Sequence, residues 1–172
     1  MKRQLLRLMI MVGLLVVPVA AASAQTPEAS LEPHEAFSPG IGTPATFFDD
    51  RGNPVINFQV TNVEHDWQEY DEFSAPERGK VYVKVDLAFT NLSNRVELVN
   101  PFSLMLIDST GLPTSSGYYG EADGLMNAEA SIEPGETVEG SMVFQVYVES
   151  SAMMLMWQPD YQMFVFVYLG ED

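Results

Sequence analysis

The sequence predicts an all-β domain that folds as an antiparallel sandwich of about seven short strands. Apolar and polar residues alternate with a period of two along most of the chain, which is the period of a half-buried strand. Gly, Pro, Asn and Asp residues punctuate these runs as turn formers. The best helix candidate, residues 121–130, is short and contains Gly124, so it could form only one or two turns. Short strands with this punctuation are typical of a β-sandwich.

The first 24 residues have the three parts of a cleavable secretory signal. A basic start precedes an apolar run at residues 8–19, and Ala-Ser-Ala at 22–24 supplies a cleavage site. The run is shorter than the roughly 20 residues that span a bilayer, and no cysteine follows it. We therefore expect a secreted or otherwise extracytoplasmic chain that starts near Gln25, with no transmembrane segment after cleavage and no lipid-modified cysteine.

Residues 25–44, QTPEASLEPHEAFSPGIGTP, differ in composition from the rest of the chain. They are rich in Pro, Ala, Ser and Glu and poor in aliphatic side chains. Such a segment buries too little apolar surface to offset the entropy lost on ordering. We therefore predict a flexible tether at 25–44, followed by the folded domain at 45–172.

The chain is strongly acidic and has no cysteine. It carries 24 Asp and Glu against 8 Lys and Arg, and loss of the signal leaves five basic residues and a net charge of −19. This balance argues against nucleic acid or an anionic membrane surface as a partner, because both need a basic footprint. We expect a soluble monomer, and the lack of cysteine excludes disulfides and thiolate metal sites.

Seven segments are predicted as strands: residues 45–48, 55–64, 80–90, 97–108, 137–148, 153–157 and 162–169. Turn sequences separate them, such as DDRGNP, APERG, NLSN, DSTG and EPGE. The alternation of apolar and polar residues is most regular in the third segment, residues 80–90, and its apolar side chains should form one layer of the core. They are those of Val81, Val83, Val85, Leu87 and Phe89.

The later strands have patterns of their own. In the segment 137–148 the side chains of Val138, Met142, Phe144, Val146 and Val148 should face the core. Gly140 in the same segment suggests a bulge or a close approach of another chain segment. The segment 162–168 is almost wholly apolar, which suits a strand covered on both faces or paired on both sides.

Three segments together resemble a family of exported bacterial domains of unknown function. They are RGKVYVKVDLAFTNLSN at 78–94, NPFSLMLIDSTG at 100–111 and IEPGETVEGSMVFQV at 132–146. This family is placed in the telokin-like superfamily of immunoglobulin-like sandwiches, which includes an immunogenic secreted mycobacterial antigen. The resemblance covers most of residues 46–169. It implies an immunoglobulin-like fold and an extracellular setting, and it brings no active site.

Catalytic machinery is not evident, so we expect no enzyme activity and no cofactor. Histidine occurs only at His34 and His65, and no Gly-x-Ser-x-Gly elbow is present. Methionines in SAMMLMW could offer thioether ligands to copper. Alternation sends Met154 and Met156 to one face and Met153 to the other, so packing in the core is the favoured interpretation.

Two connections are candidates for binding an unknown protein or glycan at the cell envelope. The segment 65–79 interleaves acidic residues with Trp67, Tyr70 and Phe73. These aromatic side chains either fold over the open end of the sandwich or form a binding loop, since immunoglobulin-like domains commonly recognise partners through their loops. The segment 109–130 contains Tyr118 and Tyr119 among Ser and Gly, a composition typical of adaptable binding loops.

The alternative function is metal binding, with calcium favoured over copper. Asp49, Asp50 and Asn53 surround Gly52, and Asp66 lies in the second acidic cluster. Hard oxygen ligands of this kind suit calcium. The first loop lacks the EF-hand spacing, however, and a tight turn at 49–54 is the favoured interpretation.

Overall fold

The computed structural model describes residues 39–116, 123–126, 128–151, 153–159 and 165–170. The predicted signal peptide at 1–24 and most of the predicted tether lie outside these ranges, as do Tyr118 and Tyr119. Within the described part of the chain, no helix is long and apolar enough to cross a membrane.

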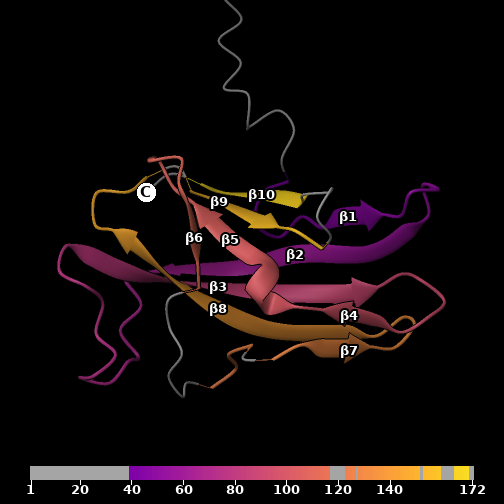
Figure 1. Cartoon of the computed structure of the whole chain (residues 1–172), viewed down its shortest axis with the longest axis horizontal. Helices are drawn as coiled ribbons and strands as arrows, with labels where there is room; N and C mark the ends of the chain where they lie inside the picture. The colour runs from indigo at the N-terminus through magenta and orange to yellow at the C-terminus, as the bar shows by residue number, and fades with distance from the viewer. Residues whose placement is uncertain (1–38, 117–122, 127, 152, 160–164, 171–172) are drawn as a thin grey trace, which may run out of the picture. The chain divides into compact units, whose positions relative to one another are not determined.

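The described residues form ten strands and one short 3₁₀ helix (Figure 1). Their bounds are β1 Ala45–Phe48, β2 Pro54–His65, β3 Lys80–Asn91, β4 Glu97–Val99, η1 Pro101–Ser103, β5 Leu104–Ile107, β6 Pro113–Ser115, β7 Ala130–Ile132, β8 Thr137–Tyr147, β9 Met153–Trp157 and β10 Val165–Gly170. One four-stranded sheet has the order β1-β2-β3-β8 and another has the order β10-β9-β5-β6, while β4 and β7 form a two-stranded sheet. All of these strand pairs are antiparallel.

The two four-stranded sheets share one apolar core. On β3 the side chains of Val83, Val85, Leu87 and Phe89 are all buried in it, as the alternation predicts. Trp157 of the second sheet packs against the first sheet, with its ring centroid 5.3 Å from that of Phe89 and 5.5 Å from that of Phe58. The predicted all-β sandwich is therefore confirmed.

The prediction of one strand at 97–108 is wrong. Proline lacks an N–H and does not fit the interior of a sheet, and Pro101 lies in this segment. The chain instead forms η1 there, capped by Asn100, whose Oδ1 accepts the Phe102 N–H at 2.9 Å. The turn redirects the chain, so β4 pairs with β7 while β5 pairs with β6 and β9.

Gly140 marks a close approach, as predicted. A Cβ atom at this position would clash with the Cγ of Met126. The segment 124–126 lies along the edge of β8, because the Ser141 N–H donates to the Gly124 carbonyl at 2.8 Å and the Met126 N–H donates to the Ser141 carbonyl at 2.9 Å. Glycine at 140 therefore leaves room for a segment that covers this edge of the sheet.

Two segments differ from the expected bounds, one at the start of the folded domain and one at the end of β8. Residues 39–44, assigned above to the tether, already contact both sheets. The Tyr168 N–H donates to the Pro39 carbonyl at 2.9 Å, and the Gly42 N–H donates to the Val60 carbonyl at 2.8 Å. The strand β8 ends at Tyr147, one residue earlier than predicted. Val148 is therefore 62% exposed, and the expectation that it faces the core is wrong.

Candidate binding surface at the loop end of the sandwich

The β2–β3 loop, residues 66–79, is anchored on the outer face of the first sheet. Trp67 is fully buried against Tyr82 and Val143, and its backbone N–H donates to the Tyr82 carbonyl at 2.9 Å. The rings of Trp67 and Tyr82 meet edge to face at 6.0 Å, and the half-buried Tyr70 ring lies 5.3 Å from that of Tyr82. The structure thus brings Trp67 and Tyr70 together as packing groups, and Trp67 offers no surface to a partner.

The remainder of this loop is tied to the sheet by hydrogen bonds. The Tyr82 hydroxyl donates to the Ser74 carbonyl at 2.8 Å, and the Glu77 N–H donates to Gln145 Oε1 at 3.0 Å. Lys80 Nζ forms an ion pair with Glu77 at 2.8 Å. The side-chain hydrogen bond from Lys80 to Glu77 raises the pKa of Lys80 above its ordinary value.

Three loops meet at the same end of the sandwich. Figure 1 shows the β2–β3 and β8–β9 connections at one end of the sheets and the β1–β2 and β3–β4 connections at the other. The Val148 N–H donates to the Gly79 carbonyl at 3.1 Å, which joins the β8–β9 loop to the β2–β3 loop. The Ser151 N–H donates to Ser109 Oγ at 3.3 Å, which joins it to the β5–β6 loop. We call these three loops, residues 66–79, 108–112 and 147–151, the loop end.

Asp108 holds two of these loops together through a nearly buried carboxylate. Its Oδ2 accepts the Ser150 hydroxyl at 2.6 Å, and its Oδ1 accepts the Thr110 hydroxyl at 2.5 Å and the Thr110 N–H at 2.9 Å. Burial alone would raise the pKa of Asp108, but these hydrogen bonds together hold it below its ordinary value. The carboxylate is therefore the form that stabilises the loop end.

We expect Asp108→Asn to destabilise the protein at neutral pH by about 1–3 kcal/mol, which is typical for lost hydrogen bonds to a charged group. A carboxyl whose pKa is lowered on folding stabilises the folded state above its unfolded pKa, and this contribution disappears as the pH falls through the folded value. The difference in unfolding free energy between wild type and variant should therefore shrink below about pH 4. Denaturant titrations at pH 7 and pH 3 would measure it, and an equal difference at both pH values would contradict this role.

The loop end encloses an open cleft of about 420 Å³. Its lining residues are Gly79, Ser109, Thr110, Tyr147, Val148, Glu149 and Ser150. Tyr147 is 56% exposed, and Lys80 Nζ lies 5.4 Å from its ring centroid in a cation–π contact that covers one face of the ring. The adjoining β5–β6 loop exposes Leu112 to 69%. Exposed apolar side chains therefore border a cleft whose loops are held by hydrogen bonds.

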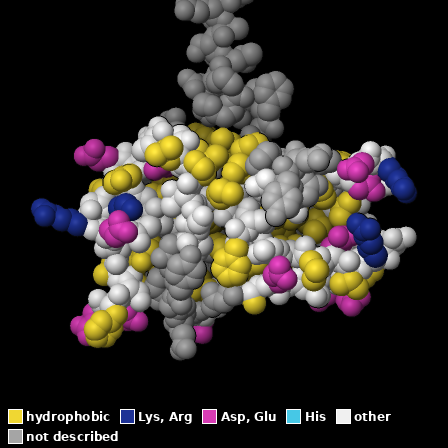
Figure 2. Space-filling model, viewed as in Figure 1, with side chains coloured by type: hydrophobic (Ala, Val, Ile, Leu, Met, Phe, Trp, Pro, Cys, Tyr) yellow, Lys and Arg dark blue, Asp and Glu magenta, His cyan; other side chains and the backbone are white. Residues whose placement is uncertain are grey.

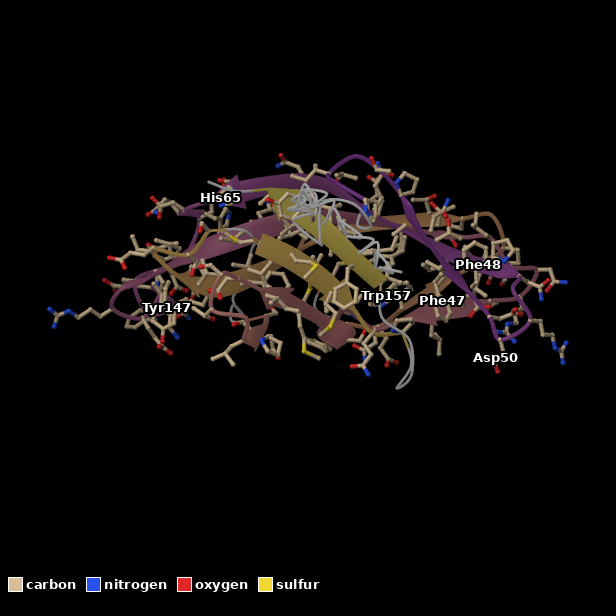
Figure 3. The ribbon with its side chains drawn as sticks, turned by 90° about the horizontal axis from the view of Figure 1, so that it is seen from above. Phe47, Phe48, Asp50, His65, Tyr147 and Trp157 are labelled. Carbon is tan, nitrogen blue, oxygen red and sulfur yellow. The ribbon has the colours of Figure 1, made fainter. Side chains whose placement is uncertain are left out.

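The calcium candidates are not brought together. Asp49 Oδ1 accepts the backbone N–H groups of Asn53 at 2.8 Å and Arg51 at 2.9 Å, as in a tight turn. The side-chain hydrogen bond from Asn53, followed by the Asn53 N–H, lowers the pKa of Asp49. Asp66 lies beyond the other end of the twelve-residue strand β2, roughly 40 Å along the chain. Figure 3 accordingly shows Asp50 at the opposite end of the ribbon from His65.

Within the described ranges there is no group of three or more His, Cys, Asp or Glu side chains that could hold a metal ion. The methionines divide between two environments. Met142 and Met153 lie in the core, whereas Met154 and Met156 lie on the outer face of the second sheet, where Met105 pairs across from Met156. Alternation therefore predicted the faces of Met153, Met154 and Met156 correctly. The prediction that the methionines pack in the core holds for Met142 and Met153 but not for Met154 and Met156.

The sequence did not single out every residue of the loop end. Val148 continues the apolar alternation of β8 and was predicted to face the core, whereas Tyr147 is the last residue of the strand and lies on its outward face. The exposure of Val148 follows from the turn after Tyr147, where the Ser150 N–H donates to the Tyr147 carbonyl at 2.9 Å. The Ser-Ser pair at 150 and 151 is the one signal in the sequence that could have indicated this turn.

Comparisons with solved structures show the same fold. The ycdA protein of Bacillus subtilis, described as a candidate lipoprotein, has a TM-score of 0.58 and 16% identity over 74% of this chain. The chain spans only 38% of the length of ycdA. The yjhA protein of Bacillus subtilis has a TM-score of 0.54 and 14% identity, over 76% of this chain and 98% of that one. MPT63, a secreted protein of Mycobacterium tuberculosis, has a TM-score of 0.59 and 11% identity, over 77% of this chain and 95% of that one.

The sequence itself also matches a known family. No curated protein gave a significant match. The family model described as a domain of unknown function, DUF4352, matches residues 53–164, a range that includes all three loops of the loop end. The chain therefore belongs to the DUF4352 family, a domain family of unknown function, and it shares its β-sandwich fold with these solved structures.

Proposed function

We propose that the protein is an exported, non-enzymatic interaction module that binds a partner at the cell envelope through the loop end. The observation that carries this proposal is the junction of the three loops. Hydrogen bonds from Val148, Ser150 and Ser151 tie the loops to one another around a cleft with exposed apolar borders. A surface that is already ordered loses little conformational freedom on binding, which favours affinity.

The side chains at this surface are of the kind that contribute most to binding. Tyrosine is enriched among the residues whose truncation weakens protein interfaces most, and Tyr147 is both exposed and held by Lys80. Loops at the ends of immunoglobulin-like sandwiches are common recognition sites. The secretory signal in the sequence supports an extracytoplasmic location, and the secreted and lipoprotein descriptions of the similar folds agree with it.

We expect the double variant Tyr147→Ala with Val148→Ala to lose at least tenfold in capture of a partner. The exported chain, tagged at its C-terminus, would be immobilised and exposed to solubilised envelope proteins and, separately, to cell-wall glycans. Both residues are exposed, so the variant should keep the stability of wild type.

The matched control is Phe48→Ala, which removes an aromatic side chain that is 46% exposed at the opposite end of the sandwich (Figure 3). It should capture the partner as wild type does. Capture that both variants retain in full, or that only Phe48→Ala loses, would contradict the choice of the loop end.

A further inference from the structure

Phe73 is the most exposed large hydrophobic side chain in the described part of the protein, at 91%. Single exposed apolar residues are common on protein surfaces. Phe73 differs from them in its setting, because the other two aromatic residues of the same loop, Trp67 and Tyr70, pack down on the sheet. The loop thus packs two aromatic rings on the sheet and presents the third to solvent.

The backbone around Phe73 is held in place. Asp71 Oδ1 accepts the N–H groups of Phe73 at 2.9 Å and Ser74 at 2.8 Å, which forms a turn at the tip of the loop. On the N-terminal side of the tip Trp67 is buried, and on the C-terminal side Ser74 accepts the Tyr82 hydroxyl. The aromatic ring is therefore presented by an ordered segment.

Exposed carboxylates are close to Phe73 in the sequence of the loop. Glu69, Asp71 and Glu72 are all exposed, and Arg78 is the one Lys or Arg in the sequence from 64 to 79. In Figure 2 a hydrophobic side chain lies among acidic ones at the end of the molecule where Figure 1 shows the β2–β3 loop projecting. The loop therefore presents an exposed aromatic side chain within an acidic segment.

We propose that Phe73 is the anchor of the contact, and that it inserts into an apolar pocket on a partner protein whose rim is lined by Lys and Arg. This inference rests on the proposed function and names the chemistry of the partner. Complementary charge speeds the encounter and excludes wrong partners, while a desolvated aromatic ring supplies most of the affinity. A protein is favoured over an anionic cell-wall glycan, because the carboxylates would repel the glycan.

Photocrosslinking tests this inference directly. Phe73, Tyr147 and, as a control, Phe48 would each be replaced by p-benzoylphenylalanine in the full chain, expressed in its own host and irradiated. Positions 73 and 147 should crosslink to the same protein, and position 48 should not. The peptide crosslinked at position 73 should contain Lys or Arg within a few residues of the attachment point.

Two perturbations test the charge part of the inference. The double variant Glu69→Gln with Glu72→Gln should reduce the yield of crosslinking at position 73 several-fold, and so should 0.5 M NaCl, since salt screens contacts between exposed charges. Both glutamates are exposed, so folding should be unaffected. A yield that neither perturbation changes would overturn the basic rim.

The outcomes separate the two proposals. Crosslinking from position 147 but not from position 73 would overturn the role of Phe73 and leave the loop end as the binding surface. Crosslinking from neither position, with the Phe48 position reacting instead, would overturn both. A neutral or acidic peptide attached at position 73 would overturn the stated chemistry of the partner.

Discussion

Val85→Asp and Phe144→Asp are each expected to abolish folding. Both side chains are fully buried in the core, and they lie on neighbouring strands where Val85 pairs with Met142 and Phe144 pairs with Val83. An unpaired buried charge costs several kcal/mol, whereas the whole domain is stabilised by only about 5–15 kcal/mol. The chain has no cysteine, so no disulfide can offset the loss.

Circular dichroism and denaturant titration would measure this effect. The matched control is Thr61→Asp, which adds the same charge at an exposed position of β2 and should unfold cooperatively with nearly wild-type stability. Cooperative unfolding of Val85→Asp at the wild-type midpoint would show that the assignment of the β3 faces is wrong.

Trp157→Ala is expected to cost about 3–5 kcal/mol of global stability, the usual range for truncating a buried tryptophan. Its indole joins the two sheets through contacts with the rings of Phe47, Phe58 and Phe89. Trp67→Ala is the same chemical change in the small cluster under the β2–β3 loop. It should cost less global stability, because this cluster packs on the outer face of one sheet alone.

Hydrogen exchange distinguishes these two variants. Trp67→Ala should accelerate amide exchange in residues 66–79 and leave the exchange of β3 and β8 close to that of wild type. Trp157→Ala should accelerate exchange across both sheets. Equal global costs, or a β2–β3 loop that exchanges as in wild type when Trp67 is removed, would show that Trp67 does not anchor the loop.

The regular strands could be predicted from the sequence, because a period of two is a direct consequence of one-sided burial. The bounds of β1 and β9 agree with the predicted ranges, those of β3 and β8 differ by one residue at one end, and those of β2 differ by one residue at each end. The two strands β6 and β7 were missed because three residues are too few to establish a period. The break at Pro101 was missed because apolar residues continue on both sides of it.

The binding surface could be predicted only in part. Composition identified the β2–β3 connection, but it could not tell that Trp67 is buried and Phe73 exposed, since the path of a loop depends on partners such as Tyr82 and Gln145 in distant strands. The contact of Asp108 with Ser150 joins residues 42 positions apart. Local sequence patterns contain no information on such contacts.

The most direct test of the loop end as the binding surface is the hydrogen-exchange footprint of the protein bound to its captured partner. Binding should slow amide exchange in residues 66–79, 108–112 and 147–151, and it should leave the opposite end, residues 49–54 and 91–97, unchanged. Protection confined to the opposite end would contradict the account.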